Sequence, residues 1–338
     1  MLKRRRFLSI AAAGAATAWL PGRVLAASPP PSRPTVWKGV AMGAAASMTL
    51  VHPDRAHARA MIARCVAEVD RLESIFSLYR PGSALSRLNA AGVLQQPPIE
   101  LVELLSFALS LAHASGGAFD PSVQPLLRLY FDHFARPGAS PQGPPPAAIA
   151  QVRQRVGFGD VELGAHRIRL RRAGAAITLN GVAQGFVTDR VADLLLANGF
   201  GDVLVDLGEG RALGRRPDGG AWRAAVAAPD ATGRTLFELP LGSGRGQSAA
   251  LATSGGHGTR FGTDPRLHHL LDPATGRSAN HLASVSVAAP RATLADGLST
   301  TLSILAPARH ARLLADYPAV RAWSVDAAGN VTGPAIGA

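Results

Sequence analysis

Apolar residues recur at helical spacing in several parts of the chain. The longest case runs from Pro53 to Phe76, where a single stripe predicts an amphipathic helix. Its members are Ala60, Ile62, Cys65, Val66, Val69, Leu72 and Ile75. A second helix is expected over about residues 99–114, because the chain then reaches Ser115-Gly116-Gly117. Further helices are expected at 147–156, 186–198 and 292–305.

Short runs that alternate or are continuously apolar predict strands, mostly in the second half. Residues 37–51 alternate small and apolar side chains and are interpreted as one strand. The other expected strands are 167–170, 176–179, 202–207, 222–228, 235–241, 249–252, 284–288 and 321–325. Because strands and helices mix without regular βαβ alternation, the sequence predicts an α+β fold.

The N-terminal segment, residues 1–26, has the pattern of an export signal. A basic stretch, Lys3 to Arg6, precedes a short apolar core, and Ala26 ends a small-residue cleavage site. The run Arg5-Arg6-Phe7-Leu8-Ser9 resembles a bacterial twin-arginine signal, which predicts export to the periplasm; an ordinary secretory signal is the alternative. Residues 27–36 are Pro-rich and are expected to form a disordered leader.

Composition narrows the class of protein. With 47% hydrophobic and 17% charged residues, the chain can form a core, so a disordered protein is excluded. The mature chain lacks a stretch of about 20 uncharged apolar residues, so we expect no transmembrane anchor. The single cysteine, Cys65, excludes an internal disulfide and is interpreted as a small core residue.

The net charge of +12 first suggests a nucleic-acid partner. Five of the basic residues belong to the predicted signal, which leaves +7 (+12 less five) on the mature chain. The remaining arginines are scattered and only 5% of residues are aromatic, so no clustered nucleic-acid footprint is present. We therefore expect no nucleic-acid partner.

Two segments carry groups suited to a phosphate and its cation. Asp296 and Thr300 share one face of a predicted helix and offer two hard oxygens, which suit Mg²⁺; the alternative is that they cap the helix. Asn180 to Phe186 leads from a strand into a helix with glycines that allow close backbone approach, and a helix start favours an anion. Each signal is weak by itself.

A third segment, Asp206 to Gly210, resembles part of a dinucleotide fingerprint. The expected glycine-rich helix does not follow it, so we interpret it as a tight glycine turn. Polar groups also gather at residues 253–257 and 268–276. Here His269 is suited to general-base chemistry, while Asp272 is either a second candidate base or part of a hairpin turn. A histidine-based transition-metal site also remains open.

Taken together and in order, these segments resemble the ApbE family of FAD:protein FMN transferases over about residues 38–332. The resemblance rests on seven motifs: Met42-Gly43, Phe76 to Tyr79 with Ser83 to Asn89, Gly117 to Pro121, Leu179 to Asp189, Ala252 to Gly255, His269 to Gly276, and Ala295 to Thr300. It implies one large α+β domain, T-fold-related, over residues 37–332, with mixed antiparallel sheets and packed helices. Residues 333–338 would be a tail.

The resemblance also implies a reaction and its residues. Such proteins cleave the pyrophosphate of FAD with Mg²⁺, transfer FMN to a Thr or Ser of an acceptor protein, and release AMP. By match of position, Asp296, Thr300 and the carbonyl of Gly181 would hold Mg²⁺, and His269 and Asp272 would be the catalytic candidates. The nucleotide would be bound by Met42, Tyr79, Ala118, Phe119, Asp120, Thr178, Gln184 and Leu270.

The chain departs from the family pattern at a few positions. Thr178 stands where Asp is usual, Asn180 where a small residue is usual, and Gln184 where Lys or Glu is usual, while Glu209 replaces a glycine. Similar forms occur in exported relatives linked to nitrous oxide respiration, whose acceptor would be a periplasmic or membrane electron-transfer protein. The departures keep two alternatives open: a non-catalytic FAD-binding or flavin-delivery protein, and an FAD pyrophosphatase.

Overall fold

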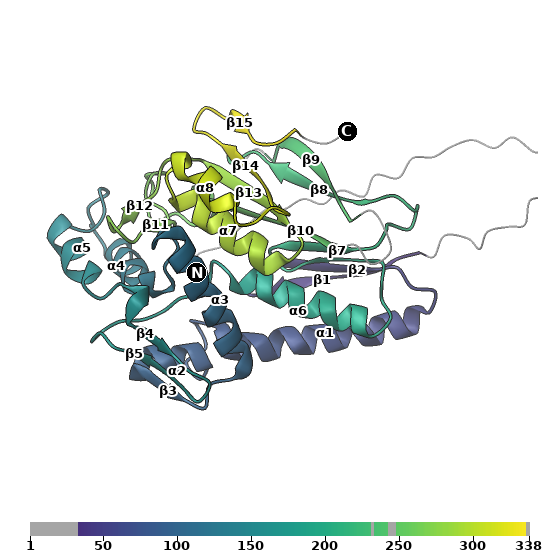
Figure 1. The fold of residues 1–338 in the computed structure, drawn as a ribbon, viewed down its shortest axis with the longest axis horizontal. Coiled ribbons are helices and arrows are strands. Elements are labelled where there is room, and N and C mark those ends of the chain that lie inside the picture. The colour runs from purple at the N-terminus through teal and green to yellow at the C-terminus, as the bar shows by residue number, and fades with distance from the viewer. Residues whose placement is uncertain (1–32, 231–232, 243–247, 336–338) are drawn as a thin grey trace, which may run out of the picture.

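An antiparallel sheet of eight strands, in the order β1-β2-β6-β7-β10-β13-β14-β15, is the centre of the fold (Figure 1). The computed structural model describes residues 33–230, 233–242 and 248–335. The mixture of helices and antiparallel strands confirms the expected α+β class. The helices are α1 (Arg55–Phe76), α2 (Ala84–Ala91), α3 (Ile99–Ser115), α4 (Gln124–Phe134), α5 (Pro146–Arg153), α6 (Ala183–Ala197), α7 (Ala292–Ile304) and α8 (His310–Leu314).

The remaining strands form three small sheets, β3-β5-β4, β8-β9 and β11-β12. The strands are β1 (Thr35–Ala41), β2 (Ala44–Leu50), β3 (Val93–Gln95), β4 (Val161–Leu163), β5 (Arg167–Leu170), β6 (Val203–Asp206), β7 (Gly210–Leu213), β8 (Trp222–Ala227), β9 (Thr235–Leu241), β10 (Ser248–Gly255), β11 (Leu271–Asp272), β12 (Arg277–Ser278), β13 (Ser284–Ala289), β14 (Arg321–Val325) and β15 (Val331–Thr332).

The two faces of the large sheet are covered differently. One face packs against α1, α6 and α7 and forms the main core, in which Met48, Val205 and Val287 are fully buried (Figure 1). On the other face, the β8–β9 hairpin covers Leu204, Leu251 and Trp323 and forms a second, smaller core. Because successive side chains of a strand point to opposite faces of the sheet, the large sheet contributes side chains to two separate cores.

The expected single strand over residues 37–51 is wrong. Met42 and Gly43 have φ values of 50° and 75°, and they divide the segment into the β1–β2 hairpin. A two-residue loop in which both φ values are positive matches the twist of the flanking strands. The pattern of small and apolar residues alone does not show that the chain reverses there. The large sheet also begins at Thr35, inside the expected leader; residues 1–32, with the predicted signal, lie outside the described residues.

The first helix is confirmed, but two members of its predicted stripe are not buried. Ala60 and Val66 are exposed, whereas Cys65 lies inside the main core with no accessible surface. Each residue rotates the helix by about 100°. Ala60 is two residues before Ile62 and Val66 is one residue after Cys65, so both point away from the face formed by Ile62, Cys65 and Val69. Asp54 caps the helix through hydrogen bonds from the amides of residues 56 and 57.

Residues 176–179 do not form the expected strand. The backbone of Ile177 instead bonds to the side chain of Asn89, whose Nδ2 donates to the Ile177 carbonyl at 2.8 Å and whose Oδ1 accepts from the Ile177 amide at 2.7 Å. A buried apolar run can satisfy its backbone in this way without joining a sheet. Two helices, α2 and α4, were not predicted, and α5 and α6 begin before their expected starts at 147 and 186.

A side lobe, formed by α4, α5 and the β11–β12 hairpin, lies at one end of the large sheet (Figure 1). Its core contains Tyr130, which is 2% exposed and donates a hydrogen bond to the carbonyl of Gly276 at 3.1 Å. This bond holds the turn of the hairpin against α4. Across the described residues, no helix is both long and apolar enough to cross a membrane.

Helices α6 and α7 approach each other closely at Gly185. A methyl group on this glycine would lie 2.3 Å from the carbonyl oxygen of Ala292 and 2.8 Å from the Cβ of Asp296. Both neighbours belong to α7, and the first is backbone that has little freedom to move. Glycine is therefore required here by the space between the two helices.

We expect Gly185→Ala to lower the free energy of unfolding by about 1–3 kcal/mol, because overpacking outweighs the roughly 1 kcal/mol that alanine gains in a helix. Urea denaturation measures the change. Gly201→Ala is the control, since nothing lies within 4 Å of its added methyl group, and its stability should stay close to that of the wild type. Equal stabilities of the two variants would contradict the close helix contact.

Candidate active site

Several loops meet beside the N-terminus of α6. The β6–β7 turn reaches Gln184 on α6, because a methyl group on Gly208 would lie 2.4 Å from Gln184 Nε2 and 3.6 Å from the Cβ of Ala44 on β2. The same turn reaches β10 through Glu209, whose Oε2 accepts a hydrogen bond from the Thr253 amide at 3.3 Å. The segment 206–210 is thus a tight glycine turn, as predicted, and it joins three neighbouring elements.

The predicted metal ligands lie together on and beside α7. Asp296 is 2% exposed, and its Oδ2 accepts a hydrogen bond from the Gly185 amide at 3.0 Å. Thr300, one turn further along α7, shares a hydrogen bond with Ser254 of β10 at 3.2 Å between their hydroxyl oxygens. Ser254 also bonds to Ser299 at 2.8 Å, so the end of β10 is fixed against this helix.

Gly181 completes this group. A methyl group on it would lie 3.1 Å from Thr300 Oγ1 and 3.1 Å from the ring of Phe119, so its backbone packs directly between the two side chains. Carboxylate, hydroxyl and carbonyl oxygens are the donors that Mg²⁺ prefers, and the residues present fit that ion. Within the described part of the chain, no cluster of three or more His, Cys, Asp or Glu side chains could hold a metal, which disfavours the histidine-based alternative.

Some of the residues that are expected to line a nucleotide site lie near Phe119. Phe119 is 5% exposed, and its amide donates to Ser115 Oγ at 3.1 Å. Leu270 packs with Ala118, Ala279 and Ile304 in a small apolar cluster, which brings the His269 segment to the C-terminal part of α7. Phe119 thus packs against Gly181, and its neighbour Ala118 packs in the Leu270 cluster.

Met42 and Tyr79 lie near the C-terminal end of α1. The Met42 amide donates to Glu73 Oε1 at 2.6 Å, and Glu73 is in the last turn of that helix. Tyr79 follows the helix and is 70% exposed, so its ring is accessible for contact with a ligand. Their contact with a nucleotide stays a prediction.

Asp120 has a structural function. Its carboxylate accepts hydrogen bonds from the Ser122 amide and hydroxyl at 2.7 and 2.6 Å, and from the Phe158 amide at 3.2 Å. Burial raises the pKa of this carboxyl, although the Ser122 and Phe158 donors oppose the shift. The carboxylate thus fixes the loop after Phe119, while its predicted nucleotide contact stays a prediction.

Thr178 and Gln184, two positions that depart from the family pattern, are buried at the edges of the same region. The Thr178 amide donates to the Pro121 carbonyl at 2.7 Å, and its Oγ1 accepts from the Asn180 amide at 3.2 Å. Thr178 therefore ties the segment before Gly181 to the Asp120 loop. Gln184 extends toward Gly208 in the β6–β7 turn.

The two catalytic candidates on the hairpin differ in their bonding. His269 is half-buried, and its Nδ1 lies 3.2 Å from the Thr259 carbonyl, which only accepts, so Nδ1 carries a proton. Asp272 Oδ1 accepts from the Ala274 amide at 2.9 Å, and the Asp272 carbonyl accepts from the Gly276 amide at 2.7 Å. The bonds of Asp272 therefore shape the hairpin turn, which agrees with one of its two interpretations. Whether His269 or Asp272 acts as a base stays a prediction.

Asp206 is the acidic residue of this region that sequence reasoning left without a role. It is 8% exposed, and burial raises its pKa from 3.8 to about 6, against the opposing hydrogen bond from the Gly208 amide. The position of Asp206 directly before a glycine turn could have indicated its role, because an aspartate there accepts a hydrogen bond from the backbone amide two residues later in the chain.

The pKa of Asp206 predicts a pH dependence of stability. Because the folded state favours the protonated carboxyl, its contribution is complete below about pH 4 and is lost as the pH rises through 6, a change of about 3 kcal/mol. Asp206→Asn has no such carboxyl. Urea denaturation should show the stability of this variant, relative to the wild type, rising by about 2–3 kcal/mol from pH 4 to pH 8.

Asp264→Asn is the control for that experiment. In the wild type, the hydrogen bond from Arg266 holds the pKa of Asp264 below its usual value of 3.8, so the contribution of this carboxylate is lost only as the pH falls below that value. The stability of Asp264→Asn relative to the wild type should therefore stay nearly constant from pH 4 to pH 8. A relative stability of Asp206→Asn that does not change with pH would contradict the raised pKa.

Comparison with known proteins finds relatives over most of the chain. The chain is 32% identical to the FAD:protein FMN transferase of Treponema pallidum over 270 residues. This alignment covers 74% of this chain and 72% of the relative. It is 29% identical over 288 residues to the FAD:protein FMN transferase of Klebsiella pneumoniae, covering 82% and 80%.

Two solved structures share the fold. The flavin transferase ApbE from Vibrio cholerae superposes with a TM-score of 0.77 at 24% identity, covering 90% of this chain and 97% of the other. The Pseudomonas stutzeri flavinyl transferase ApbE in its apo form gives 0.73 at 27% identity, covering 90% and 95%. The ApbE family model matches residues 42–323, and the chain therefore belongs to the ApbE family.

Proposed function

We propose that this chain is an FAD:protein FMN transferase that uses Mg²⁺. One observation carries the proposal: the helix α7 presents a buried carboxylate and a hydroxyl, Asp296 and Thr300, directly beside Gly181 and Phe119. The apolar cluster around Leu270 joins the hairpin with His269 to the same helix. Two relatives at 32% and 29% identity, named for this activity, support it.

The reaction is a phosphoryl-group transfer. The hydroxyl oxygen of an acceptor Thr or Ser forms a bond to the phosphorus of the FMN half of FAD, and the bond from that phosphorus to the bridging oxygen breaks. The bridging oxygen leaves with AMP, and the hydroxyl proton passes to a base. Bound at Asp296, Thr300 and the Gly181 carbonyl, Mg²⁺ would offset the negative charge of the pyrophosphate.

His269 is suited to accept that proton. With its Nδ1 proton donated to the Thr259 carbonyl, the lone pair of the neutral ring is on Nε2. The Tyr130 hydroxyl bonds to Gly276 at the far end of the hairpin turn, which steadies the segment that carries His269. Phe119, with Met42 and Tyr79, would provide apolar and aromatic surface for the ring systems of FAD.

The compartment and the acceptor belong to the same proposal. The twin-arginine pattern of residues 1–26 supports export in the folded state and action in the periplasm. The acceptor would then be a periplasmic or membrane electron-transfer protein with an accessible Thr or Ser. The exported subgroup linked to nitrous oxide respiration is a finer proposal, supported by Gln184 and Glu209.

Measuring AMP release with and without an acceptor domain separates the three candidate functions. The transferase should release AMP together with flavin fluorescence on the acceptor band in a denaturing gel. An FAD pyrophosphatase would release AMP and FMN without acceptor. A flavin-delivery protein would bind FAD and release no AMP, and that result would refute the proposed activity.

We expect Asp296→Ala to reduce FMN transfer at least about 100-fold, the scale of removing one group that stabilises charge in the transition state. The in-gel fluorescence assay measures the loss across a range of Mg²⁺ concentrations. Glu238→Ala, which removes an exposed carboxylate on β9, is the control and should label the acceptor normally. Unchanged labelling by Asp296→Ala would refute the metal assignment.

We expect His269→Gln to reduce the transfer rate by about 10²–10⁴-fold, the usual contribution of a general base, while FAD still binds. Quenching of flavin fluorescence on binding reports the affinity separately from the rate. A full transfer rate in this variant would assign proton removal to another group.

A further inference from the structure

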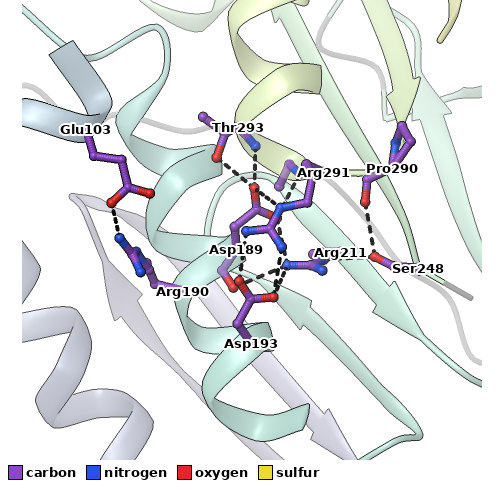
Figure 2. Close-up of polar contacts among 10 residues, drawn as sticks. Glu103, Asp189, Arg190, Asp193, Arg211, Ser248, Pro290, Arg291 and Thr293 are labelled. Atoms are coloured by element: carbon purple, nitrogen blue, oxygen red, sulfur yellow. Dashed lines mark hydrogen bonds and ion pairs between the residues drawn. The ribbon is translucent and has the colours of Figure 1, made fainter. Parts of the chain in front are cut away.

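A buried carboxylate on α6 caps the first turn of α7 (Figure 2). Asp189 is 1% exposed, and its carboxylate accepts hydrogen bonds from the Ala292 and Thr293 amides, both at 2.9 Å, and from Thr293 Oγ1 at 2.7 Å. The residue before α7, Arg291, makes no side-chain cap. Helix α7 thus takes its cap from another helix, and its first amide groups point at a full negative charge.

The arrangement is reciprocal. Asp296 of α7 accepts a hydrogen bond from the Gly185 amide, which lies in the first turn of α6. The residue before α6 likewise makes no side-chain cap. Each helix therefore receives a carboxylate from the other at its N-terminus, and the close contact at Gly185 lies between the two bonds.

Two arginines balance the charge of Asp189. Arg211 of β7 is 4% exposed, and its Nη1 lies 2.9 Å from Asp189 Oδ1 and 2.8 Å from Asp193 Oδ1. Arg291 adds contacts of 3.3 Å to Asp189 and 2.8 Å to Asp193. A buried charge is retained only when it is paired and hydrogen-bonded in this way.

Arg211 also connects the cap to the sheet. Its Nε donates to Ser248 Oγ at 2.9 Å, and Ser248 Oγ donates to the Pro290 carbonyl at 3.1 Å, two residues before α7 (Figure 2). The start of α7 is thus held from α6 through Asp189 and from the sheet through Ser248.

The neighbouring cavity does not suggest an anion site. It has a volume of about 310 Å³ and is lined in part by Arg190 and Arg291. Both cations are already engaged, Arg190 by Glu103 and Arg291 by Asp193. The charges here bind one another, which favours a structural link between elements.

We propose that Asp189 is a positioning residue for the metal ligands of α7, an inference that rests on the proposed function. Asp189 touches neither ligand, but it fixes the turn of α7 that immediately precedes Asp296. A helix rises 1.5 Å per residue with a fixed rotation, so the position of Ala292 determines where Asp296 and Thr300 lie. Without the carboxylate, two amides of α7 lose their partner inside the protein, and Arg211 keeps only its contact with Asp193 of the two carboxylates.

The test compares two isosteric substitutions in the same network, Asp189→Asn and Asp193→Asn, in the full chain. Both remove a charge that faces Arg211 and Arg291, but only Asp189 contacts the backbone of α7. Binding of Mn²⁺ alone, followed by electron paramagnetic resonance, reports the metal site without turnover. We expect Asp189→Asn to raise the Kd at least about 10-fold, as groups that orient metal ligands do, and Asp193→Asn to change it less than about 2-fold.

Hydrogen exchange of the metal-free protein gives a second readout. Amides of residues 292–296 should exchange faster in Asp189→Asn than in Asp193→Asn, since only the first loses the cap. Thermal stability alone does not discriminate, because both variants lose ion pairs. If Asp189→Asn does not fold, Thr293→Val, which removes one hydroxyl donor to the same carboxylate oxygen, should weaken Mn²⁺ binding about threefold or more.

The outcomes separate this proposal from the one on which it rests. If Asp189→Asn is folded and binds Mn²⁺ like the wild type while Asp296→Ala does not bind it, the positioning role alone is overturned. Equal weakening by Asp189→Asn and Asp193→Asn would also overturn it, because the effect would then come from lost charge. If the wild type does not bind Mn²⁺, or Asp296→Ala binds it equally well, both the metal site and the positioning role are refuted.

Discussion

The contact between α6 and α7 at Gly185 sets the geometry of the candidate site. Only a residue without a side chain lets the Ala292 carbonyl come this close, and the closeness allows the Gly185 amide to reach the Asp296 carboxylate. Gly181, just before α6, consequently packs against Thr300. Gly181 and the two α7 residues Asp296 and Thr300, more than a hundred residues apart in the chain, thus lie close together because two helices touch through their backbones.

The other parts of the site are held by independent supports. The side lobe holds the hairpin of His269 through the Tyr130 hydroxyl, and the Asp120 carboxylate holds the loop after Phe119. The β6–β7 turn reaches α6 and β10 through Gly208 and Glu209. The candidate site is therefore built from several elements, each of which is fixed by its own contacts.

Local patterns in the sequence predicted most helices and strands. They did not predict the hydrogen bonds that join polar groups far apart in the chain. The helices α1, α3 and α7 follow from apolar spacing, and the glycine turn at 206–210 follows from the missing helix after it. Residues 176–179 were misassigned because their apolar run says nothing of Asn89, which bonds to the Ile177 backbone from 88 residues away. Asp189 lies within one of the family motifs, but its role depends on its hydrogen bond from the Ala292 amide. The spacing of apolar residues does not show that these two residues are neighbours.

Cys65 shows how burial determines chemical behaviour. Its thiol lies in the main core under α1, and burial raises its pKa to about 12. Since the thiolate is the reactive form, only about one thiol in 100,000 is ionised at pH 7. The fold therefore makes the one sulfhydryl group of the chain inert toward oxidants and thiol exchange, so the folded protein forms no disulfide-linked dimers.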